Sequence, residues 1–206
     1  DYGAYFTLYG YLEILILVSA VGLVQVQERF IPELRAKHHD VALAALAWRL
    51  LVLRLTGLLV TAGLAIGFSQ TIVRWMSLEA YRDEFVLVQG ILVCEGLSRM
   101  VESYHDALLA QGRSQLSVLF RNTLRIVALG VMVSMHGLIP LRDWVRVELL
   151  VSAAGAAFGL GLFLQTQQRV RGTDGAPHGQ VKARRLFDYG ALVYLSQLCW
   201  LPASTD

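Results

Sequence analysis

The chain of 206 residues is 55% hydrophobic and only 17% charged, and its formal net charge is +2. Soluble domains carry about 25% charged residues, so this composition argues against a soluble protein and favours a membrane protein. The small net charge, without a basic stretch interleaved with aromatic residues, argues against a nucleic-acid partner. Cys94 and Cys199 both lie in apolar segments with no disulfide or metal spacing, and we expect neither a metal nor another cofactor.

Long apolar blocks separated by short charged segments run along the whole chain. The segments 55–73 and 149–168 contain no charged residue, and each is about long enough to cross a bilayer core of roughly 30 Å as a helix. Strands are not expected, because an open sheet cannot satisfy its backbone in lipid. We therefore predict an all-α, multi-pass membrane helix bundle with five complete transmembrane helices and a partial sixth. The predicted spans lie near residues 8–26, 46–69, 85–107, 117–138 and 144–166, with the sixth starting near 187.

The segment 27–40, QERFIPELRAKHHD, interrupts the apolar pattern between the first two predicted spans. Phe30, Ile31 and Leu34 can share one face of a helix, with the charged residues on the other side, and Pro32 suits the first turn of a helix. We predict a short amphipathic helix that lies on the cytoplasmic membrane surface and contacts anionic lipids. An ordinary charged loop is the alternative.

Ionisable residues inside a predicted span are costly in lipid and indicate function. Four of them in the third span, Glu95, Arg99, Glu102 and Asp106, follow one another in steps of four, three and four, so they share one helical face. This stripe either lines a cavity or locks helices together, because Arg99 can pair with Glu95 and Glu102 within its own helix.

The second and fourth predicted spans carry arginines. Arg121 and Arg125 are one helical turn apart and have no acidic partner in their own span. Arg54 lies deep in the second span, where a cavity role and a structural role are equally open, whereas Arg49 is close enough to the boundary to reach the headgroups. The five arginines against the three acids of the stripe leave a surplus of +2 in the spans. This surplus favours a cavity that receives an anionic ligand.

The fifth predicted span contains the sequence GAAFG, with glycines at Gly155 and Gly159. Small residues four positions apart let membrane helices approach closely, so this pattern predicts helix packing and does not by itself indicate a function.

Lysine and arginine are distributed unevenly between the predicted loops. The loops 27–40, 109–116 and 167–186 together hold nine basic residues, and the loops on the opposite side hold four. The positive-inside rule places the first group in the cytoplasm. The chain begins with Asp1, lacks a signal-peptide pattern and stops at LPASTD within the sixth predicted span, so we expect a piece of a longer protein.

Three stretches resemble the polysaccharide repeat-unit flippases of the MOP exporter superfamily, which also contains the multidrug and toxin extruders and the lipid II flippases. The first is the apolar span at 2–26 followed by RFIPEL at 29–34, the second is ALLAQGRSQLSVLFRNTLRIVALG at 107–130, and the third is RRLFDYGALVYLSQL at 184–198. The resemblance implies an N-terminal lobe (family helices two to six) at 1–166, a cytoplasmic linker at 167–186, and the start of the second lobe, family helix seven, at 187–206.

The resemblance also implies a function. Such proteins are transporters, not enzymes, and carry a polyprenyl-diphosphate-linked oligosaccharide from the cytoplasmic to the periplasmic leaflet of the bacterial inner membrane during polysaccharide or lipopolysaccharide biosynthesis. The expected partners are this lipid-linked substrate, membrane lipids and a coupling ion, which is either a proton or sodium. Because the diphosphate is anionic, the cavity should be cationic, and the candidate substrate-binding residues are Arg99, Arg125, Arg121, Arg54, Glu95, Glu102 and Asp106.

Two other functions stay open at this point. A cation or drug exporter of the same superfamily would favour an acidic cavity with isolated carboxylates, whereas arginines outnumber acids in these spans. A membrane polymerase or ligase that acts on polyprenyl-linked sugars would need catalytic residues in a large outer loop, and the predicted outer loops 70–84 and 138–143 are short. No nucleophile and base pair, glycine-rich phosphate loop or metal spacing is present in the sequence.

Overall fold

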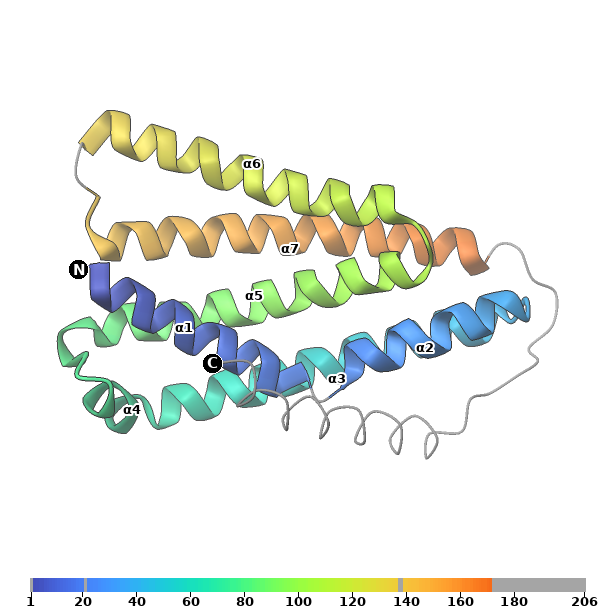
Figure 1. Ribbon diagram of the computed structural model, residues 1–206, viewed down its shortest axis with the longest axis horizontal. Helices are drawn as coiled ribbons and strands as arrows, with labels where there is room; N and C mark the ends of the chain where they lie inside the picture. The colour runs from blue at the N-terminus through green and yellow to red at the C-terminus, as the bar shows by residue number, and fades with distance from the viewer. Residues whose placement is uncertain (1, 21, 137–138, 172–206) are drawn as a thin grey trace, which may run out of the picture.

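A computed structural model describes residues 2–20, 22–136 and 139–171, and in this part of the chain helices joined by short turns are the only regular secondary structure (Figure 1). The long helices are α1 (Tyr2–Ala20), α2 (Leu23–Ala36), α3 (Asp40–Gly67), α5 (Arg82–Ala107), α6 (Gln111–His136) and α7 (Leu141–Arg171). A short α4 (Ser69–Trp75) and a 3-10 turn η1 (Glu79–Tyr81) join α3 to α5. Four helices, α1, α3, α6 and α7, are long and apolar enough to cross a membrane. The all-α prediction is confirmed, and these four helices are compatible with a membrane protein.

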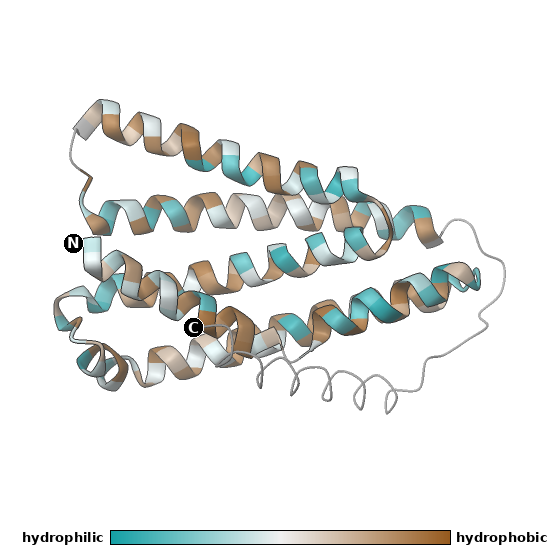
Figure 2. Ribbon diagram, in the orientation of Figure 1, coloured by the Kyte–Doolittle hydropathy of each residue, from teal (hydrophilic) through white to brown (hydrophobic). Residues whose placement is uncertain are grey.

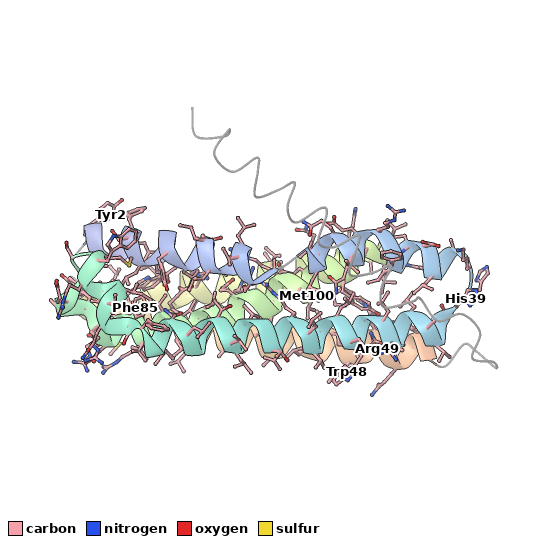
Figure 3. The ribbon with its side chains drawn as sticks, turned by 90° about the horizontal axis from the view of Figure 1, so that it is seen from below. Tyr2, His39, Trp48, Arg49, Phe85 and Met100 are labelled. Atoms are coloured by element: carbon pink, nitrogen blue, oxygen red, sulfur yellow. The ribbon has the colours of Figure 1, made fainter. Side chains whose placement is uncertain are left out.

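Helix α5 is the centre of the bundle, although it carries too many charged residues to count among those four. It packs against α1, α2, α3, α4, α6 and α7. Its apolar residues Phe85, Ile91, Leu92, Met100 and Tyr104 are fully buried between these neighbours. Figure 3 shows Phe85 and Met100 in the interior of the bundle, between α3 and the layer formed by α1 and α2. The neighbours of α5 therefore determine the surroundings of its charged side chains.

The first predicted span is two helices. The chain breaks at Gly22, whose φ of 70° lies in the left-handed region that glycine adopts without strain, and α2 then continues along the bundle (Figure 1). Helix α2 has the predicted amphipathic pattern, but Phe30, Ile31 and Leu34 are buried against α3 and α5, not against lipid. The prediction of a helix lying on the membrane surface is therefore wrong. Pro32 is exposed inside α2 and not in its first turn.

The loops group at two ends of the bundle (Figure 1). The α2–α3 turn, the α5–α6 turn and the end of α7 lie at one end, and α4, η1 and the start of α7 lie at the other. Within the described residues this grouping agrees with the loop charges, because the basic segments 27–40 and 109–116 share an end with residues 167–171. Which end faces the cytoplasm stays a prediction.

Hydrophobic residues recur along α6 and along the visible part of α3 (Figure 2). Large hydrophobic side chains are exposed along both helices, which suits contact with lipid. They include Val52, Leu53, Leu59, Val60 and Leu64 on α3, and Leu119, Ile126, Val127, Val131 and Met135 on α6. Trp48 and Arg49 point outward from the first half of α3 (Figure 3), which suits the predicted boundary position of Arg49.

Candidate functional site

Three carboxylates and two guanidiniums meet between the middle of α5, the middle of α6 and the first third of α7. We call Glu95, Glu102, Arg121, Arg125 and Glu148 the ion cluster. Arg121 bridges the two acids of α5, with its Nη1 3.2 Å from Glu95 Oε2 and its Nη2 3.2 Å from Glu102 Oε1. Because Glu95 and Glu102 are two helical turns apart on one face of α5, a single arginine from α6 can reach both.

Arg125 joins the same acids to the third helix of the cluster. Its Nη2 donates to Glu95 Oε1 at 3.1 Å, and its Nε donates to Glu148 Oε2 at 3.0 Å. A second bond from Nη2 to Glu148 Oε1 makes this pair bidentate, which is the strongest arginine–carboxylate geometry. Ser152, one turn after Glu148, donates its hydroxyl to Glu95 Oε1 at 3.0 Å. The side chain of Glu148 is 1% exposed, whereas that of Arg125 is 35% exposed.

Two glycines of α7 leave room for the side chain of Arg121 and for the helix that carries it. A Cβ on Gly155 would lie 3.2 Å from Cγ and Cδ of Arg121, and one on Gly159 would lie 3.3 Å from Ser117 Oγ. Arg121 therefore runs over the bare backbone of α7 on its way to α5. The predicted role of the GAAFG pattern in helix packing is confirmed, and the packing positions a charged side chain of the cluster.

Arg99 lies on α5 between Glu95 and Glu102 in sequence but bonds to a different helix. Its Nη1 donates to Oε2 of Glu13 on α1 at 2.8 Å, and its Nη2 donates to the other carboxylate oxygen. The alternative in which Arg99 pairs with Glu95 and Glu102 is therefore not the one that the structure shows. The side chains of Arg99 and Glu13 remain 44% and 54% exposed, although both residues lie near the middle of their helices.

Arg54 is the most buried arginine of the described part of the chain, with 2% exposure. Its Nη1 donates to Ser19 Oγ and its Nη2 to the Ile16 carbonyl, both at 3.1 Å. These are groups at the end of α1, where carbonyls lose their helical partners and a cation also interacts favourably with the helix dipole. Of the two roles left open for Arg54, the structure shows the structural one, which holds the end of α1 beside the break at Gly22.

The structure thus divides the seven predicted site residues into four that meet and three that do not. Glu95, Glu102, Arg121 and Arg125 belong to the ion cluster. Arg99 bonds to Glu13, Arg54 bonds to the end of α1, and Asp106 is exposed near the end of α5.

Glu148 is a member of the ion cluster that the sequence analysis did not predict. It lies inside the predicted span 144–166, and an ionisable residue within a span is the same signal that identified Glu95 and Arg125. Three carboxylates against two guanidiniums leave the ion cluster with a formal charge of −1. The predicted surplus of positive charge is therefore wrong for the residues that actually meet. Among the described residues, no group of three or more His, Cys, Asp or Glu side chains could hold a metal ion.

Comparison of the chain with protein-family models, with curated proteins and with solved structures finds no match. The resemblance to the flippases therefore rests on sequence motifs alone. The ion cluster and the pair formed by Arg99 and Glu13 are the features of the structure that bear on function.

Proposed function

We propose that this chain is the N-terminal lobe of a multi-pass transporter that moves an anionic, diphosphate-linked oligosaccharide lipid across the bacterial inner membrane. In this proposal α1 with α2, α3, α5, α6 and α7 are five complete spans, and the segment from 187 begins a sixth. Helix α5 can cross the bilayer despite its charges because its neighbours shield them. The linker and second-lobe segments, 167–186 and 187–206, lie almost wholly outside the described residues.

The observation that carries the proposal is a set of ionised side chains that stay accessible in the middle of the bundle. We call Glu13, Arg99 and Arg125 the polar face. Their side chains are 54%, 44% and 35% exposed, although each lies near the middle of its helix. Accessible charges at membrane depth are too costly to face lipid, so such a face lines a water-filled path or contacts another part of the protein. A two-lobed transporter requires both a water-filled path and a contact between its lobes.

The polar face suits a diphosphate because both of its cations are arginines. A guanidinium offers two parallel N–H donors to a phosphate, which fixes orientation as well as supplying charge. Arg99 is the more available of the two, since Glu13, the one ion-pair partner that it has among the described residues, is itself half-exposed. Arg125 is held by Glu95 and by the bidentate bond to Glu148, so a phosphate has to compete with two carboxylates for it. We infer that Arg99 makes the first phosphate contact and Arg125 the second.

A transport assay with a matched control tests this proposal. The full-length protein is reconstituted in vesicles, and movement of a polyprenyl-diphosphate-linked oligosaccharide between leaflets is measured for Arg99→Ala and Arg99→Lys. Arg142→Ala is the control, because Arg142 is also exposed and also pairs with a carboxylate, Asp83, but lies at the end of the bundle. We expect Arg99→Ala to lose transport at normal protein levels, Arg99→Lys to keep part of it, and Arg142→Ala to match the wild type. Full transport by Arg99→Ala would remove the phosphate contact from the proposal.

An exporter of organic cations is the second candidate, and one observation favours it. The ion cluster has a formal charge of −1, and Glu13 is the most exposed member of the polar face. In that case Glu13→Gln would abolish efflux of a fluorescent cation such as ethidium, and the lipid-linked oligosaccharide would not move in either variant or wild type. The same vesicle preparation therefore decides between the two substrates.

A further inference from the structure

The ion cluster is short of one positive charge. Two guanidiniums cannot neutralise three carboxylates, and four of the five side chains are at most 14% exposed. An uncompensated charge in such a place is strongly unfavourable, and proteins usually avoid it by taking up a proton. The cluster therefore needs one more positive charge.

Neighbouring groups do not supply that charge. Arg99 pairs with Glu13 of α1. Arg54 of α3 donates two hydrogen bonds to groups near the end of α1. Three other ionisable neighbours carry no positive charge: Asp106, on the same face of α5, Cys94 beside Glu95, and Tyr9 of α1, which lies in the electrostatic field of Glu148, Arg125 and Glu95. These neighbours leave the deficit of one positive charge in place.

The bonding within the cluster identifies the acid that can accept a proton at least cost. Glu95 has ion pairs to both arginines and a bond from Ser152, and Glu148 has a bidentate bond to Arg125. Glu102 has a single ion pair, at 3.2 Å to Arg121 Nη2, and its Oε1 has no hydrogen-bond partner although it is buried. Protonation of Glu102 therefore sacrifices fewer bonds than protonation of the other two acids.

Arg121 gives an independent sign that the cluster is not yet complete. Its side chain is 10% exposed and points into the cluster, but its Nε and Nη1 have no hydrogen-bond acceptor of suitable geometry. Buried N–H groups are rarely left in this state, and a water molecule is the ordinary way to satisfy them. A water bound by Arg121 beside Glu102 would connect that carboxylate to the accessible side of the cluster at Arg125.

We propose that the ion cluster is a proton-binding site and that Glu102 carries one exchangeable proton at neutral pH. A proton suits the geometry better than sodium, since each carboxylate is directed to a guanidinium and the described side chains offer no converging set of acidic ligands. The inference rests on the proposed function only for its consequence, which is that proton movement accompanies transport. Proton binding itself stands without it.

Infrared spectroscopy of the full-length protein in detergent tests the site without a transport assay. A protonated carboxylic acid has a carbonyl stretching band that is separate from the carboxylate bands and shifts in D2O. We expect the wild type to show this band at neutral pH and Glu102→Gln to lose it. Glu33→Gln, which changes a partly exposed acid outside the cluster that pairs with Lys37, should leave the band unchanged. A wild type without the band, or a Glu102→Gln variant that keeps it at full intensity, overturns the proposal.

Stability measurements separate Glu102 from the other acids. Glutamine mimics a protonated glutamate but needs no proton, so Glu102→Gln should raise the thermal denaturation midpoint at neutral pH, where the wild type has to take up a proton on folding. The midpoint of the wild type should fall as the pH is raised, because the proton leaves and the excess charge returns, and Glu102→Gln should lack this fall. Glu148→Gln should lower the midpoint, because Arg125 loses its bidentate partner. If instead Glu102→Gln lowers the midpoint as much as Glu148→Gln does, Glu102 is ionised and the assignment is wrong.

Three further measurements extend this test. Arg121→Gln widens the charge deficit from one to two, and we expect the carbonyl band to gain intensity. Addition of sodium chloride should leave the band in place, whereas its disappearance would show that sodium replaces the proton. In reconstituted vesicles, transport without accompanying proton movement would refute the coupling and leave the proton site intact.

Discussion

A tight contact between α5 and α3 gives a prediction that depends on tertiary packing and not on composition. Gly96 of α5 lies against Leu58 of α3, and a Cβ at position 96 would be 2.5 Å from Leu58 Cδ2 and 2.8 Å from Cδ1. Ordinary contacts between carbon atoms are about 3.5–4.0 Å, so the leucine or the helix would have to move by about 1 Å. Leu58 is fully buried and has little room to move.

The expected effect can be worked out as a difference between two glycine variants. Gly96→Ala overpacks the α3–α5 contact, which costs about 1–3 kcal/mol. Gly63→Ala is the control, because Gly63 lies within α3, where nothing stands within 4 Å of an added Cβ. Replacing glycine by alanine inside a helix stabilises it by about 1 kcal/mol in both variants. Gly63→Ala should therefore be more stable than Gly96→Ala by about 1–3 kcal/mol.

Denaturation of the full-length protein in mixed detergent micelles measures these free energies of unfolding. The double variant Gly96→Ala with Leu58→Ala should lose less stability than the sum of the single variants, because the new methyl group enters the space that the leucine leaves. If Gly96→Ala is as stable as Gly63→Ala, α3 and α5 do not approach as closely as described. The central position of α5 would then have to be revised.

Three other predictions concern the topology, Arg54 and Gly155. Cysteine replacements at Lys37 and Asp83 should be labelled by a membrane-impermeant reagent from opposite sides of the membrane, with Lys37 on the cytoplasmic side, and labelling from one side would refute the topology. Arg54→Met should lower the midpoint of thermal denaturation by removing two bonds worth about 1.5–3 kcal/mol each, whereas the exposed Arg49→Met should not. Gly155→Leu should displace Arg121 and reduce transport more than it reduces protein level, which quantitative immunoblotting beside the vesicle assay would check.

The amino-acid sequence by itself determined the helical class and the arrangement of the loops. Hydrophobic blocks long enough for a bilayer leave the backbone no alternative to helices, and this holds whatever the helices pack against. The loop charges sort the segments by side because they report on each segment separately. Helical spacing also predicts correctly that Arg121 and Arg125 share a face, as do Glu95 and Glu102, because positions one or two turns apart in one helix fix their relative direction.

Only the tertiary structure decided which charges meet. Arg99 has suitable acids one turn away on either side in its own helix, yet it bonds to Glu13, because α1 passes over that part of α5. Glu148 becomes important because α7 brings it to Arg125, a contact between helices that no periodicity within either helix encodes. The charge of a buried site is a sum over side chains from several helices, so it cannot be read from one span at a time.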